Sequence, residues 1–542
     1  MAGVPSRLWA QSTLGSSPER LARDFDLYPA DAPYGDIEGN PGLVDFNGDH
    51  YSRPHGILWD KPAYLAAKGG IPAITETVPV VVVGGGISGL TAAFRLRDLG
   101  PMLLEQEPRF GGVAKAERWK GVEFGLGSAY VTMPDDGSGA KEFLAELGIL
   151  KDFHQEGEGE AEVFYQGKPV NGFWTGATDP AHADQFKKVV DRMREVREKG
   201  YPEIPHTSSS ALSLEAFRKL DQTRFSDWLQ AEFGTLHPHV TEYAHEYCWS
   251  SFGASPFEIS AAQALNFMSV DMEGMIALPG GNAGIAQSIY AKLKSTLPAG
   301  RMRAGCFVLD VALNENGVRV CYEDAKGMLH SVQAKACVVA SPKFVAKHLI
   351  DTLSAPQREA MDAIQYRAYL VANVLIDRKI LSPGFSVMEL TGESITDPVA
   401  AAKARMFNDI VFASWAVGGN KPDQSVLTLY RALPWDTGRA ELYASGAHAR
   451  IRAQFEQAVK HVLPLVGAPE SAVSAIRITR WGHALPLAAP GLLANGVVER
   501  AAAPIGGRIF FGQQDTWASP CFEIATSTGT AAAALARKAA IG

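Results

Sequence analysis

The sequence contains 542 residues, of which 46% are hydrophobic and 20% are charged, and its formal net charge is −8 at pH 7. This length predicts two or three domains, and this composition is ordinary for a globular protein. The acidic balance argues against nucleic acid as the main partner, and five cysteines without a Cys-x-x-Cys pair favour neither a metal cluster nor a disulfide framework.

Residues 1–78 are predicted to form an extended N-terminal arm, because Pro, Gly, Asp and Tyr dominate a stretch with little periodicity. Its many aromatic residues argue against disorder, so we expect the arm to lie over the globular body. The sequence shows neither the apolar stretch of a secretory signal nor a run of about twenty apolar residues. We therefore expect a cytoplasmic protein without a transmembrane segment; a periplasmic protein is the alternative if an export signal has been trimmed.

A glycine motif follows the first predicted strand of the body. Val80–Val83 is a β-branched run typical of a buried strand. Gly84, Gly86 and Gly89 then match G-x-G-x-x-G, and apolar residues continue at helical spacing to Gly100. Between a strand and a helix, such glycines allow a tight turn, a close approach to a pyrophosphate and close helix packing. The helix N-terminus offers free N–H groups to phosphates. Taken alone, the motif leaves a merely tight turn as the alternative.

A second short strand supports a dinucleotide site. Residues 102–104 are apolar and Glu105 follows them, near the offset expected for a carboxylate that binds an adenosine ribose. A solvated charge at a strand end is the alternative for Glu105. The pattern leaves NAD and FAD as candidate cofactors.

The rest of the chain alternates in character. Residues 181–250 are predicted to be helical, with amphipathic faces that include Phe225 and Trp228. Residues 306–340 contain short β-rich runs broken by turn sequences, which predicts antiparallel strands that return to a buried strand. Residues 346–475 mix helices and strands, and residues 507–540 predict a strand, a loop and an Ala-rich helix.

These segments together resemble the flavin-containing amine oxidase superfamily, which includes monoamine and polyamine oxidases and phytoene-desaturase-like relatives. After the glycine motif, the family has an acidic residue, an arginine and a Gly-Gly pair, matched here by Glu105, Arg109, Gly111 and Gly112. "LPGGNAGIAQSI" resembles the segment before the second portion of the family's flavin domain, and "FFGQQDT" resembles its Gly-Glu-x-Thr motif. The bacterial polyamine-dehydrogenase-like members are the nearest in character.

The resemblance implies an α/β fold: a Rossmann-like FAD-binding domain of the glutathione-reductase/amine-oxidase type with an interleaved α+β substrate-binding domain. The FAD-binding domain would combine residues 79–150, 262–345 and 476–542, and the substrate-binding domain residues 151–261 and 346–475. FAD is favoured over NAD, which alone would not explain Arg109, the Gly-Gly pair or the C-terminal motif. The implied FAD-binding residues are Gly84, Gly86, Ile87, Ser88, Gly89, Glu105, Arg109, Gly111, Gly112, Val113, Val308, Gly512, Gln513, Asp515 and Glu523.

The sequence also departs from the family pattern. Gly512–Gln513 lacks the family's carboxylate, and Cys521 stands where many members place a cage aromatic. Many amine oxidases carry a lysine beside flavin N5, whereas Val371 or Ala372 falls near that place here. "RWGHALPLAAPG" lacks the cysteine used for covalent attachment, so we expect non-covalent FAD. The missing lysine favours a dehydrogenase over a fast oxidase.

Four residues are candidates for the catalytic pocket: Trp481, His483, Trp517 and Phe522. Aromatic walls attract an amine by cation–π interaction and exclude water, although core packing is the alternative for each. His483 could act as a base or orient the substrate, or simply bond to backbone. Glu523 could select a cationic amine or bind a flavin hydroxyl. His237, His239 and His245 suggest a helix boundary rather than a metal site, and we expect no metal.

We therefore predict an FAD-dependent enzyme that oxidises the C–N bond of a small-molecule amine to an imine, which water hydrolyses to an aldehyde. Oxygen, a quinone or a carrier protein would accept the electrons, and a homodimer is left open. One alternative is a desaturase or isomerase of an apolar, isoprenoid-like substrate. Another is a non-catalytic flavin-binding partner subunit.

Overall fold

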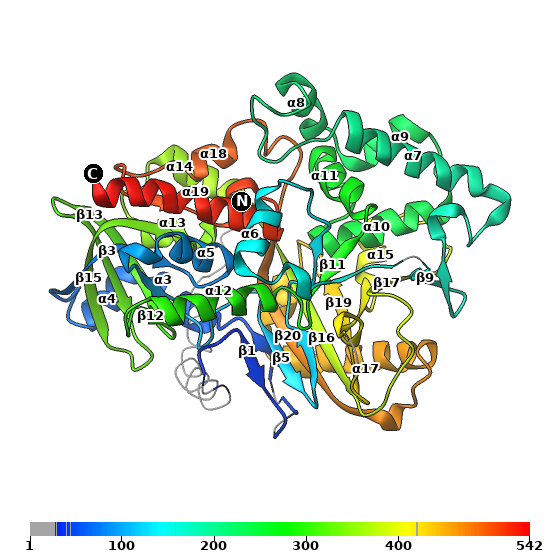
Figure 1. Cartoon of the computed structure of the whole chain (residues 1–542), viewed down its shortest axis with the longest axis horizontal. Helices are drawn as coiled ribbons and strands as arrows, with labels where there is room; N and C mark the ends of the chain where they lie inside the picture. Colours follow the sequence, from blue (N-terminus) through cyan, green and yellow to red (C-terminus); the bar gives the residue numbers. More distant parts are fainter. Residues whose placement is uncertain (1–27, 29, 40, 44, 158, 419–420) are drawn as a thin grey trace.

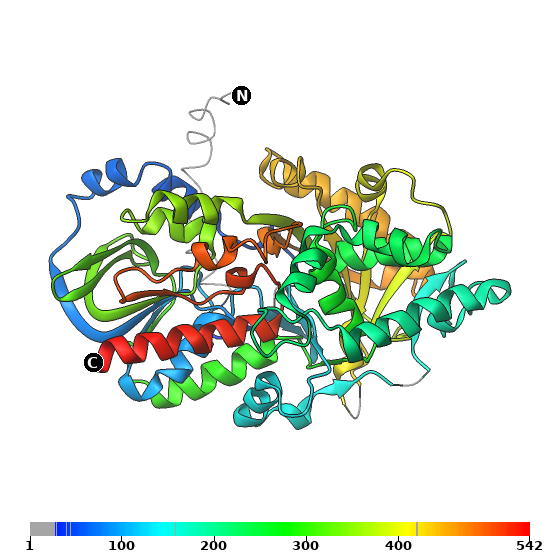
Figure 2. The same ribbon diagram turned by 90° about the horizontal axis from the view of Figure 1, so that it is seen from above.

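The computed structural model describes residues 28–542 apart from 29, 40, 44, 158 and 419–420, and it contains two large sheets side by side (Figures 1 and 2). The predicted arm residues 1–27 lie outside the described residues. Within the described residues, no helix has both the length and the apolar character needed to cross a membrane.

The first sheet has seven strands in the order β12-β4-β3-β15-β14-β13, with β21 paired to β15. Their bounds are β3 (Ile74–Val83), β4 (Met102–Leu104), β12 (Met302–Arg303), β13 (Phe307–Asn314), β14 (Gly317–Glu323), β15 (Leu329–Val339) and β21 (Ile509–Phe511). β3 lies parallel to β4 and β15, while β13, β14 and β15 pair antiparallel, as the sequence predicts for residues 306–340.

Helices cover both faces of this sheet, which explains the unbroken valine run. Val80 and Val82 pack in one core cluster with the first group of helices, and Val81 and Val83 pack in a second cluster. The first group comprises α5 (Ile87–Arg95), α6 (Gly139–Leu147), α12 (Ala283–Thr296) and α19 (Phe522–Ile541). The other face carries α13 (Lys343–Leu349), α14 (Ala355–Ala363) and α18 (Val497–Ala501). A strand buried on both faces cannot alternate polar and apolar residues.

The second sheet has eight strands in the order β10-β9-β17-β18-β19-β16-β20-β2. Their bounds are β2 (Asn47–Gly48), β9 (Ala161–Tyr165), β10 (Lys168–Asn171), β16 (Gln365–Ile376), β17 (Ser386–Leu390), β18 (Asp409–Phe412), β19 (Ser425–Ala432) and β20 (Val473–Leu487). Strand β20 pairs with β16 along almost its whole length. The start of the predicted third flavin-domain segment, 476–487, thus belongs to this sheet.

Helices pack around the second sheet, including the helical region predicted for residues 181–250. They are α7 (Ala183–Lys199), α8 (Leu214–Gln222), α9 (Phe225–Phe233), α10 (Pro238–Phe252), α11 (Ala261–Asp271), α15 (Pro398–Ala404), α16 (Gly438–Tyr443) and α17 (Ala447–Leu465). Two small three-stranded sheets complete the body. They are β1 (Tyr34–Asp36), β5 (Ala116–Trp119) and β6 (Val122–Gly125), and β7 (Val131–Thr132), β11 (Met275–Ala277) and β8 (His154–Gln155).

The described part of the arm is not wholly extended. It contains two short helices, α3 (Ser52–Leu58) and α4 (Lys61–Ala67), separated by Asp60. The Asp60 side chain accepts a hydrogen bond from the Ala63 N–H, and Pro62 occupies the first turn of α4. An N-cap carboxylate followed by proline is a local helix-start signal that the high Pro and Gly content of the arm obscures.

Candidate functional site

A cavity of about 850 Å³ lies between the two large sheets. Fourteen of the predicted site residues line it: Gly84, Gly86, Ile87, Ser88, Glu105, Gly111, Gly112, Val113, Val308, Trp481, His483, Gln513, Phe522 and Glu523. They come from widely separated parts of the chain, and the fold brings them together around one cavity. The size falls within the range of pockets that hold cofactors and small ligands.

One end of the cavity has the features of a nucleotide groove. Gly84 turns the chain after β3 with φ +106°, a conformation that favours glycine. Gly86 is the N-cap of α5, and a Cβ on it would come no closer than 3.7 Å to protein, at the Gly112 Cα. The space above Gly86 is therefore open to a ligand, and the free N–H groups of α5 face it.

Glu105 is held rigidly at this end. Its Oε2 accepts a hydrogen bond from the Gly85 N–H at 2.6 Å, and its Oε1 accepts one from the Glu107 N–H at 2.8 Å. Burial raises the pKa of Glu105, while these backbone hydrogen bonds act in the opposite direction. Each carboxylate oxygen keeps acceptor capacity for a further donor, such as a ribose hydroxyl.

Two polar atoms on the cavity wall have no partner among the described residues. They are the Ser341 hydroxyl, just after β15, and the side-chain oxygen of Asn282, just before α12. Buried polar atoms without a partner are costly, so their presence beside the glycine turn indicates a polar ligand. The open groove, the fixed carboxylate and these atoms fit a dinucleotide such as FAD.

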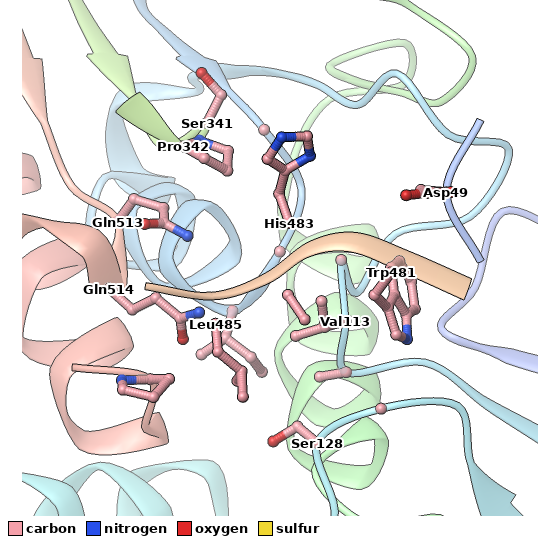
Figure 3. A pocket seen from close by; sticks show the side chains of 18 of the residues that line it. Asp49, Val113, Ser128, Ser341, Pro342, Trp481, His483, Leu485, Gln513 and Gln514 are labelled. Carbon is pink, nitrogen blue, oxygen red and sulfur yellow. The ribbon is translucent and has the colours of Figure 1, made fainter. Parts of the chain in front are cut away.

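Strand β20 crosses the cavity and places aromatic side chains at its other end (Figure 3). Trp481 is fixed because its Nε1 donates to the Leu126 carbonyl at 2.7 Å. His483 stacks on Phe344, with ring centroids 4.0 Å apart. Burial lowers the pKa of His483 to about 3, so the ring is neutral near pH 7 and is a weak base there.

The structure also shows which residue on β16 faces the cavity, near the place where many amine oxidases carry a lysine. Of the two candidates on β16, Val371 lines the cavity and Ala372 does not line it. The alternation of a strand decides this, because neighbouring residues point to opposite faces. The cavity wall beside β16 is apolar at this point.

A sequence profile for proteins described as flavin containing amine oxidoreductases matches residues 87–536. The chain belongs to this family. The chain is therefore a flavin-dependent oxidoreductase.

Relatives within and around this family act in different ways. An "Oxidoreductase PigB" from Serratia is 24% identical over 507 residues, covering 84% of this chain and 74% of the relative. A "Probable flavin-containing monoamine oxidase A" from Dictyostelium discoideum is 26% identical over 194 residues, 35% of this chain and 40% of that protein. A "Carotenoid 3,4-desaturase" from Haloarcula japonica is 27% identical over 231 residues, 38% of this chain and 45% of that protein.

Solved structures show the same fold. Cyclohexylamine oxidase from Brevibacterium oxydans matches with a TM-score of 0.61 and 17% identity, covering 85% of this chain and 99% of that one. A putrescine oxidase bound to putrescine matches with a TM-score of 0.59 and 16% identity, covering 84% and 98%. The glutathione-reductase/amine-oxidase type of fold predicted from the sequence is therefore confirmed.

Five predicted site residues of this flavoprotein do not line the cavity: Gly89, Arg109, Gly512, Asp515 and Trp517. Arg109 donates to the carbonyls of Pro33 and Ala116 and lies over the Tyr28 ring. Asp515 is fully buried and pairs with Lys343 at 2.6 Å.

The other three have packing roles. Gly89 and Gly512 each leave room for a neighbouring element, because an added Cβ would come within 3 Å of Gly84 and of Ala532 respectively. Trp517 packs against a separate apolar cluster around Leu492 and Leu493. Close packing against neighbouring elements accounts for these three residue types in this structure.

The cavity wall also carries a buried carboxylate that no motif in the sequence indicates. Asp409, at the start of β18, accepts hydrogen bonds from the hydroxyls of Ser386 at 2.7 Å and Ser250 at 3.1 Å. No described Lys or Arg forms an ion pair with it, and burial raises its pKa. Tyr369 and Tyr430, whose ring centroids are 5.8 Å apart, line the cavity beside it. In the sequence, Asp409 is a single acidic residue at the start of a short apolar strand.

Glu523 provides a second acid on this wall. It lies in the first turn of α19 and accepts a hydrogen bond from the Thr132 hydroxyl at 3.1 Å. Burial raises its pKa, and a helix N-terminus offsets part of that cost by favouring the charged form. With Asp409, it places two buried carboxyl groups in the lining of the cavity.

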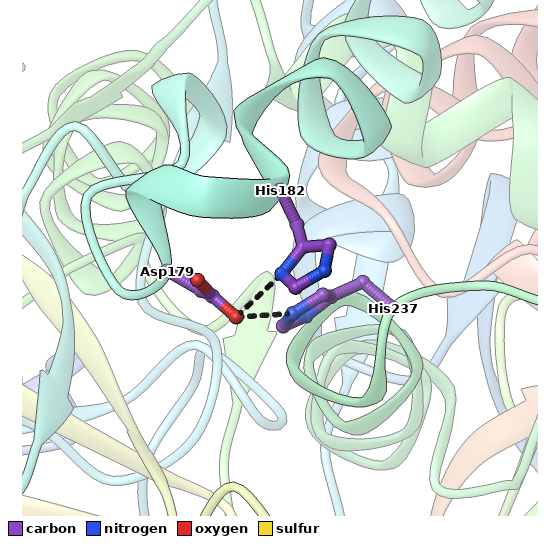
Figure 4. A group of neighbouring side chains, drawn as sticks. All are labelled: Asp179, His182 and His237. Atoms are coloured by element: carbon purple, nitrogen blue, oxygen red, sulfur yellow. Dashed lines mark hydrogen bonds and ion pairs between the residues drawn. The ribbon is translucent and has the colours of Figure 1, made fainter.

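His237, His239 and His245 do not line the cavity, and His237 lies in a cluster with Asp179 and His182 (Figure 4). Asp179 accepts hydrogen bonds from His182 at 2.9 Å and from His237 at 3.2 Å. One side-chain atom of each residue could bind a metal, and these three atoms lie within 4.8 Å of one another. His237 is the N-cap of α10, and its Nδ1 accepts from the His239 N–H. An Nδ1 that accepts fixes the proton on Nε2, which then donates to Asp179. Hydrogen bonding and capping thus account for this cluster.

Proposed function

We propose that this flavoprotein oxidises the C–N bond of an amine to an imine, with non-covalently bound FAD. The observation that carries the proposal is the buried carboxylate of Asp409 facing a cavity wall of tyrosines. A carboxylate that is desolvated and held by neutral donors without a cationic partner stabilises a cation placed against it. The relatives named as amine oxidases agree with this choice.

FAD would supply the chemistry of accepting a hydride equivalent. The residues of this chain would bind, orient and shield the reactants. Glu105 and the N-terminus of α5 would hold the nucleotide half. Trp481 and Tyr369 pair across β20 and β16 and would form an aromatic wall that attracts the amine and excludes water.

Sheet register supports an acidic anchor remote from the reacting bond. Asp409 pairs with Tyr430, and Tyr430 pairs with Val371, so the three lie in one row across β18, β19 and β16. Neighbouring strands are about 4.8 Å apart, which puts Asp409 about 10 Å from Val371. If the reacting bond lies beside Val371, Asp409 would hold a second positive charge on a diamine or polyamine.

Non-covalent attachment is supported by the cavity's cysteines. Strand β20 carries none, and the cavity wall includes Cys306 and Cys521. Burial raises the pKa of Cys306 to about 11 and that of Cys521 well above its ordinary value. Thiols that stay protonated are poor nucleophiles toward a flavin.

The test is anaerobic mixing of the purified yellow protein with monoamines, diamines and apolar polyenes while flavin absorbance is followed. Bleaching by amines is expected. Bleaching by polyenes alone would instead assign a desaturase, and no bleaching by any amine would refute the proposal.

The variant Asp409→Asn separates the anchor from the chemistry. We expect it to raise the KM for a diamine at least tenfold while changing that for a monoamine little. Asp271→Asn is the matched control, because Asp271 is a buried carboxylate that accepts from Tyr130 and Tyr247 but does not line the cavity. If Asp409→Asn changed the KM for both substrate classes equally, Asp409 would not bind a second positive charge.

A further inference from the structure

The N-terminal segment 47–61 lies before the region matched by the family profile, yet it lines the same cavity. We call residues 47–61 the clasp. Its cavity-facing residues are Asp49, His50, Tyr51, Pro54, His55, Leu58 and Trp59. Glu105 and Val308 line the same cavity from the first sheet. The clasp thus adds a wall to the predicted nucleotide end.

One end of the clasp is fixed to the second sheet. Strand β2 pairs parallel with β20, and a Cβ on Gly48 would overlap the Arg480 carbonyl, so the two backbones are closely apposed. The Asp49 carboxylate accepts hydrogen bonds from Arg480 at 3.0 Å, the Gly482 N–H at 2.8 Å and Tyr443 at 2.9 Å. Figure 3 shows Asp49 on this segment on the same side of the cavity as Trp481.

The other end is fixed to the first sheet. The buried Arg53 guanidinium donates to the carbonyls of Gly305 at 3.0 Å, Glu323 at 2.9 Å and Asp324 at 2.9 Å. Ile57 packs in a small apolar cluster with residues of β13 and β14. Buried charge-assisted hydrogen bonds of this kind are among the stronger local interactions.

The middle of the clasp reaches the cofactor groove itself. His50 donates its backbone N–H to Glu107 at 3.2 Å, and its ring bonds to the same carboxylate. Glu107 lines the cavity two residues after Glu105. Trp59 lines the cavity while 66% of it is exposed, so the clasp lies between this part of the cavity and the protein surface.

We propose that the clasp closes the nucleotide end of the groove over the adenosine half of FAD, so that FAD enters and leaves only when the clasp detaches from one sheet. The chemistry suits this ligand. Tyr51, Pro54 and Leu58 offer apolar surface to an adenine ring in the same cavity that the carboxylate of Glu105 lines. The inference rests on the proposed cofactor, and it adds cofactor-site residues and a gate that lie outside the family match.

The variant Arg53→Ala tests the gate, because it removes the four hydrogen bonds of Arg53 to Gly305, Glu323 and Asp324, and Arg53 itself does not line the cavity. FAD release is followed by flavin fluorescence after dilution. We expect release to be at least tenfold faster than in the wild type. Arg537→Ala is the matched control, since Arg537 on α19 makes a partly exposed pair with Asp98. If Arg53→Ala fails to fold, Lys61→Ala replaces it, because Lys61 anchors the same end through Asp351 at 2.7 Å.

Hydrogen exchange provides an independent measurement. Residues 47–61 should gain protection when FAD binds the apoprotein, while residues 168–171 of β10 at the far edge of the second sheet should not. Unchanged release rates together with unchanged exchange in 47–61 would overturn the clasp and leave FAD binding intact. A wild-type protein that binds no FAD would overturn both the clasp and the proposed cofactor.

Discussion

Gly86 and Gly89 belong to the same G-x-G-x-x-G motif, but changing each to alanine should have different effects on the protein. Gly86 has φ −73° and ψ −177°, which alanine adopts without strain, and its new Cβ would lie 3.7 Å from the nearest protein atom. At Gly89 the new Cβ would lie 1.8 Å from the Gly84 carbonyl oxygen. We expect Gly86→Ala to lose FAD and keep its fold, and Gly89→Ala to lose stability as well.

The magnitude follows from that overlap. Ordinary contact requires about 3.4 Å, so α5 must move away from the turn by about 1.5 Å, and the obstacle is backbone that cannot rotate aside. Overpacking of a rigid contact costs about 1–3 kcal/mol, and this case belongs at the upper end. The methyl group of Gly86→Ala meets only the space where a phosphate would lie, so its cost appears in FAD affinity.

The assay compares the two variants in both properties. Flavin content after gel filtration reports affinity, and urea unfolding of the apoproteins reports stability without the cofactor. Gly86→Ala should match the wild type in urea and elute with little flavin. If the apo Gly89→Ala variant were as stable as the wild type, the packing argument would be refuted. If the Gly86→Ala variant retained FAD fully, the phosphates of FAD would not lie beside Gly86.

Three further predictions follow from single contacts. Asp515→Asn should lower the free energy of unfolding by about 3–5 kcal/mol, measured in urea, because it leaves the Lys343 ammonium buried without its charge partner; a loss under 1 kcal/mol would contradict this. Val371→Lys should speed reoxidation of the reduced enzyme by oxygen in stopped-flow, because a cation stabilises developing superoxide; native reoxidation as fast as turnover would show that the dehydrogenase interpretation is wrong. Burial opposes ionisation of Glu107, but the adjacent His50 outweighs it and lowers the pKa to about 2. Ionised Glu107 therefore stabilises the fold at pH 4.5 and progressively less toward pH 2, so the stability difference from Glu107→Gln should shrink as the pH falls over that interval.

The nucleotide half of the site could be predicted from the sequence because its signals are local. Gly84, Gly86 and Glu105 lie within one strand–turn–helix–strand unit, where spacing along the chain fixes spacing in space. Asp409 could not be found this way. It comes to the cavity through strand pairing with Tyr430, and a single acid in a short strand gives no indication of which face will be buried.

Long-range contacts also decided which polar residues serve the fold. Arg109 and Asp515 match family motifs, yet their charged groups bond to Ala116 and Lys343, outside the cavity lining. A motif specifies residue types along the chain, whereas the partner of a buried charge depends on which distant element packs against it.

By itself, the sequence determined the strand–turn–helix of the groove, because periodicity and glycine spacing encode it directly. The fold type and the flavoprotein family were implied by the resemblance of its motifs to a known family. The tertiary structure alone decided that β20 joins the second sheet, that Val371 rather than Ala372 faces the cavity, and that residues of the segment 47–61 line it. Each of these depends on register or packing between segments far apart in the chain. The free energy that stabilises such contacts comes from burying the surfaces of two segments against each other, so it cannot be inferred from either segment alone.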